Sequence, residues 1–99
     1  MELTTLQERL EAKNHIFQVY RNQVNKDLER SGFEAIAANE PDAFLKELVS
    51  VLSEAIEESD TKLQQLYYLA DVPEKDLEKG IVMAFIVREW VKIRFRLGQ

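Results

Sequence analysis

The stretch Ile81-Val82-Met83-Ala84-Phe85-Ile86-Val87 is the longest unbroken apolar run in the sequence, and it decides the fold. Val and Ile favour buried strands, but Met83, Ala84 and the following Arg88-Glu89 pair favour a helix, and no other segment suggests a strand that could pair with it. Further apolar residues continue the run at Trp90, Val91, Ile93, Phe95 and Leu97. The segment therefore predicts a helix that is apolar on every side.

A helix of this kind must be covered all round. Two or three partner helices from a chain of 99 residues offer too little surface for that. The sequence therefore predicts self-association, with a homodimer joined through the helix that contains Ile81–Leu97, either alone or together with the long first helix described next.

The first third of the chain predicts one long amphipathic helix. Apolar residues recur at spacings of three, four and seven between Thr4 and Arg30, and Ser31-Gly32 is a typical helix end. Residues 33–38 are expected to form one short extra turn, in which Phe33 and Ile36 close the end of the core. The central and C-terminal thirds also carry apolar residues at helical spacing.

From Pro41 to Ala70 the apolar stripe keeps one phase, which gives either one helix or two helices bent near Asp60; the Ser59-Asp60-Thr61 cluster favours the break. The last helix is expected to start at Asp71–Glu74 and to run to about Leu97, with a kink or short break at Gly80. The predicted fold is all-α: a small antiparallel bundle of three to four helices, with residues 1–99 as a single domain and the C-terminal helix as its most buried element.

Composition excludes several classes of protein. With 45% apolar residues, three Gly, two Pro and no Cys, the chain is neither disulfide-stapled nor of low complexity. The run Ile81–Val87 is far shorter than the roughly 20 residues of a membrane span. The start Met1-Glu2-Leu3 lacks a signal-peptide layout, so we expect no membrane association and a cytoplasmic protein.

The charge is distributed unevenly along the chain. Residues 1–33 carry no net charge, residues 34–78 carry −9 and residues 79–99 carry +4, which gives the total of −5. A negatively charged chain is a poor general binder of nucleic acid, because association begins against the field.

Residues that could carry chemistry are sparse. The only histidine, His15, has Glu11 one turn before it, but no second His completes a metal site of the carboxylate-bridged kind. The acidic cluster Glu54, Glu57, Glu58 and Asp60 is expected to be a solvated helix face. The sequence thus predicts no catalytic residue, no metal and no cofactor, and a non-enzymatic interaction or scaffold protein.

The residues proposed for partner binding lie on the last two helices. The basic residues of the last helix have aromatic residues between them, and Tyr68 falls off the apolar stripe that contains Tyr67. Trp90 and Phe95 are expected in the core, with the basic residues as a ridge facing Glu74–Glu78 or Glu54–Asp60, within the chain or across a dimer. Nucleic-acid binding by the ridge is the less favoured alternative to a protein partner of unknown identity. The candidate partner residues are Tyr68, Arg88, Lys92, Arg94 and Arg96.

Overall fold

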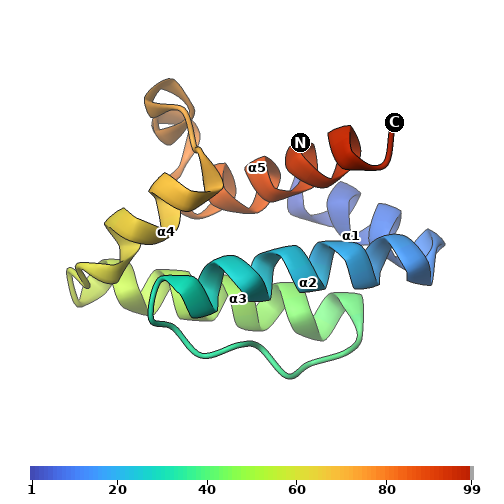
Figure 1. Cartoon of the computed structure of the whole chain (residues 1–99), viewed down its shortest axis with the longest axis horizontal. Helices are drawn as coiled ribbons and strands as arrows, with labels where there is room; N and C mark the ends of the chain where they lie inside the picture. Colours follow the sequence, from blue (N-terminus) through green and yellow to red (C-terminus); the bar gives the residue numbers. More distant parts are fainter. Residues whose placement is uncertain (99) are drawn as a thin grey trace.

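The chain folds as a set of helices packed around one apolar core (Figure 1). The structure, a computed structural model, describes residues 1–98, and within them it contains helices and loops but no strand, which confirms the all-α prediction. The elements are α1 (Leu3–Ala12), α2 (Asn14–Arg30), α3 (Pro41–Glu57), α4 (Lys62–Ala70), the 3₁₀ helix η1 (Glu74–Lys79) and α5 (Ile81–Arg96). The bundle is therefore more divided than the three to four helices predicted.

The expected helix from Thr4 to Arg30 is wrong, because the chain breaks at Lys13. That residue has an extended backbone (φ −143°, ψ 111°), so α1 turns away from the line of α2. The break lets α1 pack against both α2 and α3, with Leu6 and Leu10 fully buried. No Gly or Pro marks this position, and the apolar spacing continues across it.

The short extra turn predicted over residues 33–38 is also absent, and the segment is an extended loop. Asn25 on α2 holds it as a neighbouring strand would: its Nδ2 donates to the Ile36 carbonyl at 3.0 Å and its Oδ1 accepts from the Ile36 amide at 2.8 Å. The Arg21 guanidinium donates to the carbonyls of Ile36, Ala37 and Ala38. These bonds satisfy the backbone groups that a helical turn would have used. Ile36 still reaches the core and is buried, as expected.

The break near Asp60 is confirmed. Ser59 takes a positive φ of 52°, and the Asp60 carboxylate accepts a hydrogen bond from the Lys62 amide at 2.9 Å as α4 begins. The last predicted helix is divided further. Asp71 adopts the left-handed conformation, and Gly80 (φ 114°) separates η1 from α5.

The core receives side chains from every α-helix. Phe44 of α3 lies edge-on to Phe17 and Tyr20 of α2, with ring centroids 5.8 and 6.3 Å apart. The prediction that the C-terminal helix is the most buried element is wrong: α2 has eight buried residues and α5 has six. Near the C-terminal end of α5, Phe95 is 80% exposed. No helix within residues 1–98 is long and apolar enough to cross a membrane, as predicted.

Candidate functional site

Helix α5 has one face turned to the core and one turned outward. Phe85, Ile86 and Ile93 have no exposed surface, and Trp90 is 6% exposed, as predicted for Trp90. The other face carries four apolar residues that are not fully buried. These form what we call the α5 stripe: Met83, Val87, Val91 and Phe95.

The four residues of the α5 stripe follow one another at a spacing of four, so they wind slowly along one side of the helix. Met83 packs against the edge of the core, whereas Val87 and Val91 are half-buried without joining it. Phe95 is 80% exposed, so its predicted place in the core is wrong. Each step of four residues rotates slightly more than one full turn of the helix. Successive residues of the stripe therefore point further from the core toward the C-terminal end of α5.

A groove lies between the N-terminal residues and α5. It has a volume of about 510 Å³, and its apolar lining comes from Met1, Leu3, Met83, Ala84, Val87 and Val91. Charged residues stand at its edge: Glu2, Asp76, Lys79 and Arg88. Three of the four stripe residues therefore line the groove, and Phe95 lies beyond it.

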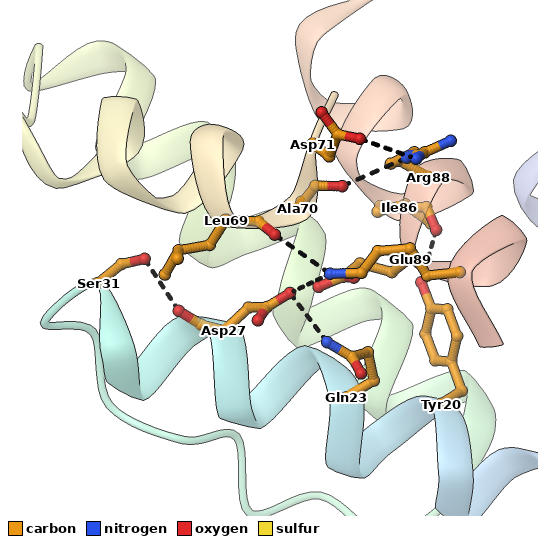
Figure 2. A network of polar contacts seen from close by, with 11 residues as sticks. Tyr20, Gln23, Asp27, Ser31, Leu69, Ala70, Asp71, Ile86, Arg88 and Glu89 are labelled. Carbon is orange, nitrogen blue, oxygen red and sulfur yellow. Dashed lines mark hydrogen bonds and ion pairs between the residues drawn. The ribbon is translucent and has the colours of Figure 1, made fainter. Parts of the chain in front are cut away.

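Two of the predicted ridge residues, Arg88 and Lys92, are engaged inside the chain, and Figure 2 shows Arg88 beside Ala70 and Asp71. Lys92 donates to the Leu69 carbonyl at 3.2 Å, and Arg88 donates to the Ala70 carbonyl at 3.3 Å. Both carbonyls belong to the last turn of α4, where the helix dipole is negative and cations are stabilising. Arg88 and Lys92 therefore hold the C-terminal end of α4, and the expected contacts with 74–78 or 54–60 are not the ones they make.

Each of these cations also meets a carboxylate. Arg88 lies 3.2 Å from Asp71, which is itself exposed, whereas Lys92 lies 3.2 Å from Asp27, whose side chain is only 3% exposed. Arg94 and Arg96 are different, since both are exposed and neither has an ion pair within residues 1–98. The ridge is thus divided into an internal pair and a free pair.

Sequence reasoning missed the buried carboxyl of Glu89. It lies on the inner face of α5 with no exposed surface, and Lys92 Nζ is 3.5 Å from its Oε2. The pKa of Glu89 is raised to about 9, first by burial and then by the neighbouring Asp27, whose effect exceeds the lowering by Lys92. Glu89 is accordingly protonated at neutral pH.

The pKa of Asp27 is shifted in the opposite direction. Burial alone would raise its pKa, but hydrogen bonds with Glu89, Lys92 and Gln23, together with the charge of Lys92, lower it below the usual value. Gln23 Nε2 donates to Asp27 Oδ2 at 3.1 Å (Figure 2). The site therefore holds one carboxyl that burial keeps neutral and one carboxylate, with Lys92 within 3.2 Å of Asp27 and 3.5 Å of Glu89. The signal in the sequence was the position of Glu89, three residues before Lys92 and in phase with Phe85 and Ile93.

The two neighbouring tyrosines have different environments. Tyr68 is 79% exposed, as predicted, and lies on α4, away from the α5 stripe. Tyr67 is half-buried against Phe85, with ring centroids 5.6 Å apart, and its hydroxyl donates to the Ile81 carbonyl. Burial raises the pKa of Tyr67 above its usual range. Tyr67 is thus part of the joint between α4 and α5.

The residues that the sequence suggests for metal binding do not form a metal site within residues 1–98. His15 and Glu11 are both exposed, and no group of three His, Cys, Asp or Glu residues within residues 1–98 is arranged to hold an ion.

No known protein family, curated protein or solved structure matches the chain. Its function is therefore inferred from its own residues.

Proposed function

We propose that the protein is a non-enzymatic interaction or scaffold protein that self-associates as a homodimer through the outward face of α5. The observation that carries the proposal is the α5 stripe, in which Val87 and Val91 lie outside the core and Phe95 is 80% exposed. A homodimer joined by a two-fold axis brings one such stripe against the same stripe of a second copy.

The gain from covering the stripe supports this proposal. Full burial of a large apolar side chain is worth about 1.5–3 kcal/mol relative to leaving it in water. Phe95 is close to that limit, and Val87, Val91 and Met83 each have part of their surface left to bury. In a two-fold dimer each of these residues is buried on both copies, so the gain in free energy is doubled.

The environment of the titratable groups also favours an interaction protein over an enzyme. Glu89 is the group whose pKa is raised to about 9, but it has no exposed surface. Its neighbour Asp27 is 2% exposed, so a substrate has no access to either carboxyl. We therefore assign the pair to the joint between α2 and α5 and not to catalysis.

The first test is the absolute molar mass from light scattering behind a sizing column, over a concentration series at low and high salt. We expect a mass of twice 11.6 kDa at high concentration in both salts. Val91→Glu should give a monomer, because the new carboxylate would be desolvated in the interface. A wild-type monomer at every concentration would overturn the proposal.

The matched control for Val91→Glu is Val51→Glu on α3. Val51 is also half-buried outside the core, but it lies on a helix that the proposed interface does not use. Both variants are compared by circular dichroism to establish that they fold. A dimer that Val51→Glu breaks as readily as Val91→Glu would place the interface elsewhere.

A second candidate function is nucleic-acid binding. The observation in its favour is that Arg94, Phe95 and Arg96 are all exposed, so the end of α5 carries two cations and an aromatic ring on which a base can stack. Against it stand the net charge of −5 and the engagement of Arg88 and Lys92 within the chain. Retention on a polyanion column at low salt, lost steeply with added salt, would favour this function.

A further inference from the structure

We propose that the side of α2 next to the extended loop binds an acidic, extended segment of a partner protein. This surface, which we call the α2 basic face, consists of two neighbouring hollows and the cations that line them. Its residues lie on α2, on the loop and at the end of α5, outside the α5 stripe, so the proposal goes beyond the homodimer and does not depend on it. The cations are Arg21, Lys26, Arg30 and Arg96.

The two hollows are neighbours, since Asn22 and Lys26 line both. The larger hollow, of about 700 Å³, lies between α2 and the loop, which runs back alongside α2 before α3 begins (Figure 1). The smaller hollow, of about 290 Å³, lies between α2 and Arg96 at the end of α5. The α2 basic face is therefore one continuous surface that includes the loop, α2 and the end of α5.

The charge of this face is opposite to that of the whole molecule. The lining of the two hollows contains four cations and one carboxylate, Glu29, in a chain whose net charge is −5. Glu34 on the loop is exposed but lines neither hollow. None of the four cations has an ion pair within residues 1–98. An anionic ligand is therefore attracted to this face and repelled by the rest of the surface.

Arg21 is the cation that the fold holds in place. It is half-buried, its Nε donates to the Ala38 carbonyl at 2.8 Å, and its Nη2 donates to the carbonyls of Ile36 and Ala37 at 3.2 and 3.0 Å. These carbonyls fix the guanidinium without neutralising its charge. Within residues 1–98 its Nη1 has no hydrogen-bond partner, and that atom is not buried. A guanidinium that is fixed in this way and has donors left over suits a carboxylate.

The composition of the face favours a polypeptide over a nucleic acid. No aromatic residue lines either hollow, so a base has no ring to stack on. In the loop lining, Ala35 is exposed, and neither its amide nor its carbonyl has a hydrogen-bond partner within residues 1–98. The main chain of an extended peptide can donate to and accept from such backbone groups.

The spacing of the cations predicts a pattern of acidic residues in the partner. Lys26 and Arg30 are both exposed and lie four residues apart, which is about 6 Å along α2. In an extended chain, side chains on the same side are two residues apart, which is about 7 Å. Acidic residues at alternate positions of the partner segment therefore match the two cations.

The test uses a fluorescein-labelled peptide in which Glu alternates with Ser, and fluorescence anisotropy measures its binding to the full chain. We expect saturable binding at low salt that weakens as salt is added. Lys26→Glu with Arg30→Glu should weaken the binding at least tenfold. Lys26→Gln with Arg30→Gln removes the charges without adding carboxylates and should weaken it in the same direction. Circular dichroism establishes that both variants fold, and Arg21 is left unchanged because it holds the loop.

The matched control is Arg9→Glu with Lys46→Glu. Like the test variant, it reverses one Arg and one Lys at exposed positions, but these lie on α1 and α3 and line neither hollow. The control and the test variant have the same net charge. We expect the control to weaken the binding much less, because its charges lie outside the face. In nuclear magnetic resonance spectra of the wild type, the amides of Ala35 and Ala37 should shift as the peptide is added.

The absence of binding at low salt, equal weakening in the test and control variants, or unchanged amides at Ala35 and Ala37 would overturn the proposal. So would tighter binding of an oligodeoxythymidylate with the same number of charges, lost in the same variant, which would assign the face to nucleic acid. A loss of dimer mass in Lys26→Glu with Arg30→Glu would assign it to an acidic segment of a second copy and overturn the proposal as well. A tenfold loss confined to the test variant, together with the amide shifts, supports it. A monomeric wild type that still binds the peptide in this way overturns the homodimer alone.

Discussion

Lys92 on α5 and Asp27 on α2 are 65 positions apart in the chain, and their side chains meet at 3.2 Å in a region where Asp27 is almost completely shielded from water. The same ammonium also reaches the Leu69 carbonyl of α4. One lysine therefore joins three helices. It also supplies the positive charge for a site that holds two carboxyl groups.

Removal of that charge is expected to destabilise the fold. Lys92→Met leaves Asp27 buried without its cation and the Leu69 carbonyl without its donor. Because the Lys92 side chain is 21% exposed, we expect a loss of roughly 2–4 kcal/mol in the free energy of unfolding, somewhat below that of a fully buried pair. Urea unfolding measures it. Adding Asp27→Asn to Lys92→Met should recover part of the lost stability. If the losses of the two substitutions are additive, the ion pair is contradicted. The control is Lys46→Met at an exposed position.

Glu89→Gln is expected to change how stability depends on pH. Between pH 4.5 and about 9 the unfolded chain has lost the Glu89 proton while the folded chain keeps it, so wild-type stability falls as pH rises through this window. The slope is up to about 1.4 kcal/mol per pH unit. Gln stays neutral and can donate to Asp27, so the variant should lose this slope and gain stability at neutral pH.

Urea unfolding at several pH values inside that window compares Glu89→Gln with the wild type. Asp27 does not confuse the result, because its lowered pKa contributes stability that is lost only as pH falls below its ordinary value of 3.8. The control is Glu47→Gln, the same substitution at an exposed position on α3. Identical slopes in Glu89→Gln and the wild type would show that Glu89 is ionised in the folded chain.

Gly80→Ala is expected to weaken the joint between η1 and α5. A Cβ at Gly80 would meet nothing within 4 Å, so the cost comes from its φ of 114°, which L-residues rarely adopt. We expect a loss of about 1–2 kcal/mol in the free energy of unfolding. Thermal unfolding measures it, and Gly98→Ala, with a similarly positive φ near the chain end, should cost less. Equal losses in both variants would contradict a particular role for Gly80.

Asn25→Ala is expected to release the extended loop after α2. The variant removes both hydrogen bonds to Ile36 and leaves the buried Ile36 amide without a partner, a cost of about 2 kcal/mol, while the Ile36 carbonyl keeps its bond from Arg21. Hydrogen exchange of the Ile36 amide should accelerate strongly. Asn22→Ala, at an exposed position on the same helix, should leave that amide protected. An Ile36 amide that stays equally protected in Asn25→Ala would show that other contacts hold the loop.

Local sequence signals predicted the parts of the fold that local energetics determine. The breaks near Asp60 and at Gly80 follow from residues that favour caps and positive φ, and the burial of Trp90 follows from the helical spacing of its apolar neighbours. The break at Lys13 has no such signal. It arises because α1 gains contacts with α2 and α3 by turning back, which only the assembled chain can show.

The candidate site was predictable only in part, for the same reason. Hydropathy reports that Phe95 prefers an apolar environment but not whether a neighbouring helix extends far enough to provide one. Glu89 was missed because a carboxyl is expected in water, and the groups that make its burial possible include Asp27, which lies far from it in sequence. Arg88 and Lys92 were expected to meet acids in the 54–60 or 74–78 segments, but the carbonyls at the end of α4 lie closer to them.

The capping of α4 by α5 has a consequence for the way the molecule opens. Helix α4 has nine residues, fewer than the roughly 12–15 that an isolated helix needs to persist in water. Its last carbonyls are bound by Arg88 and Lys92, and Tyr67 ties it to Ile81. When α5 detaches, α4 therefore loses its structure with it, and their amides exchange with solvent as one cooperative unit.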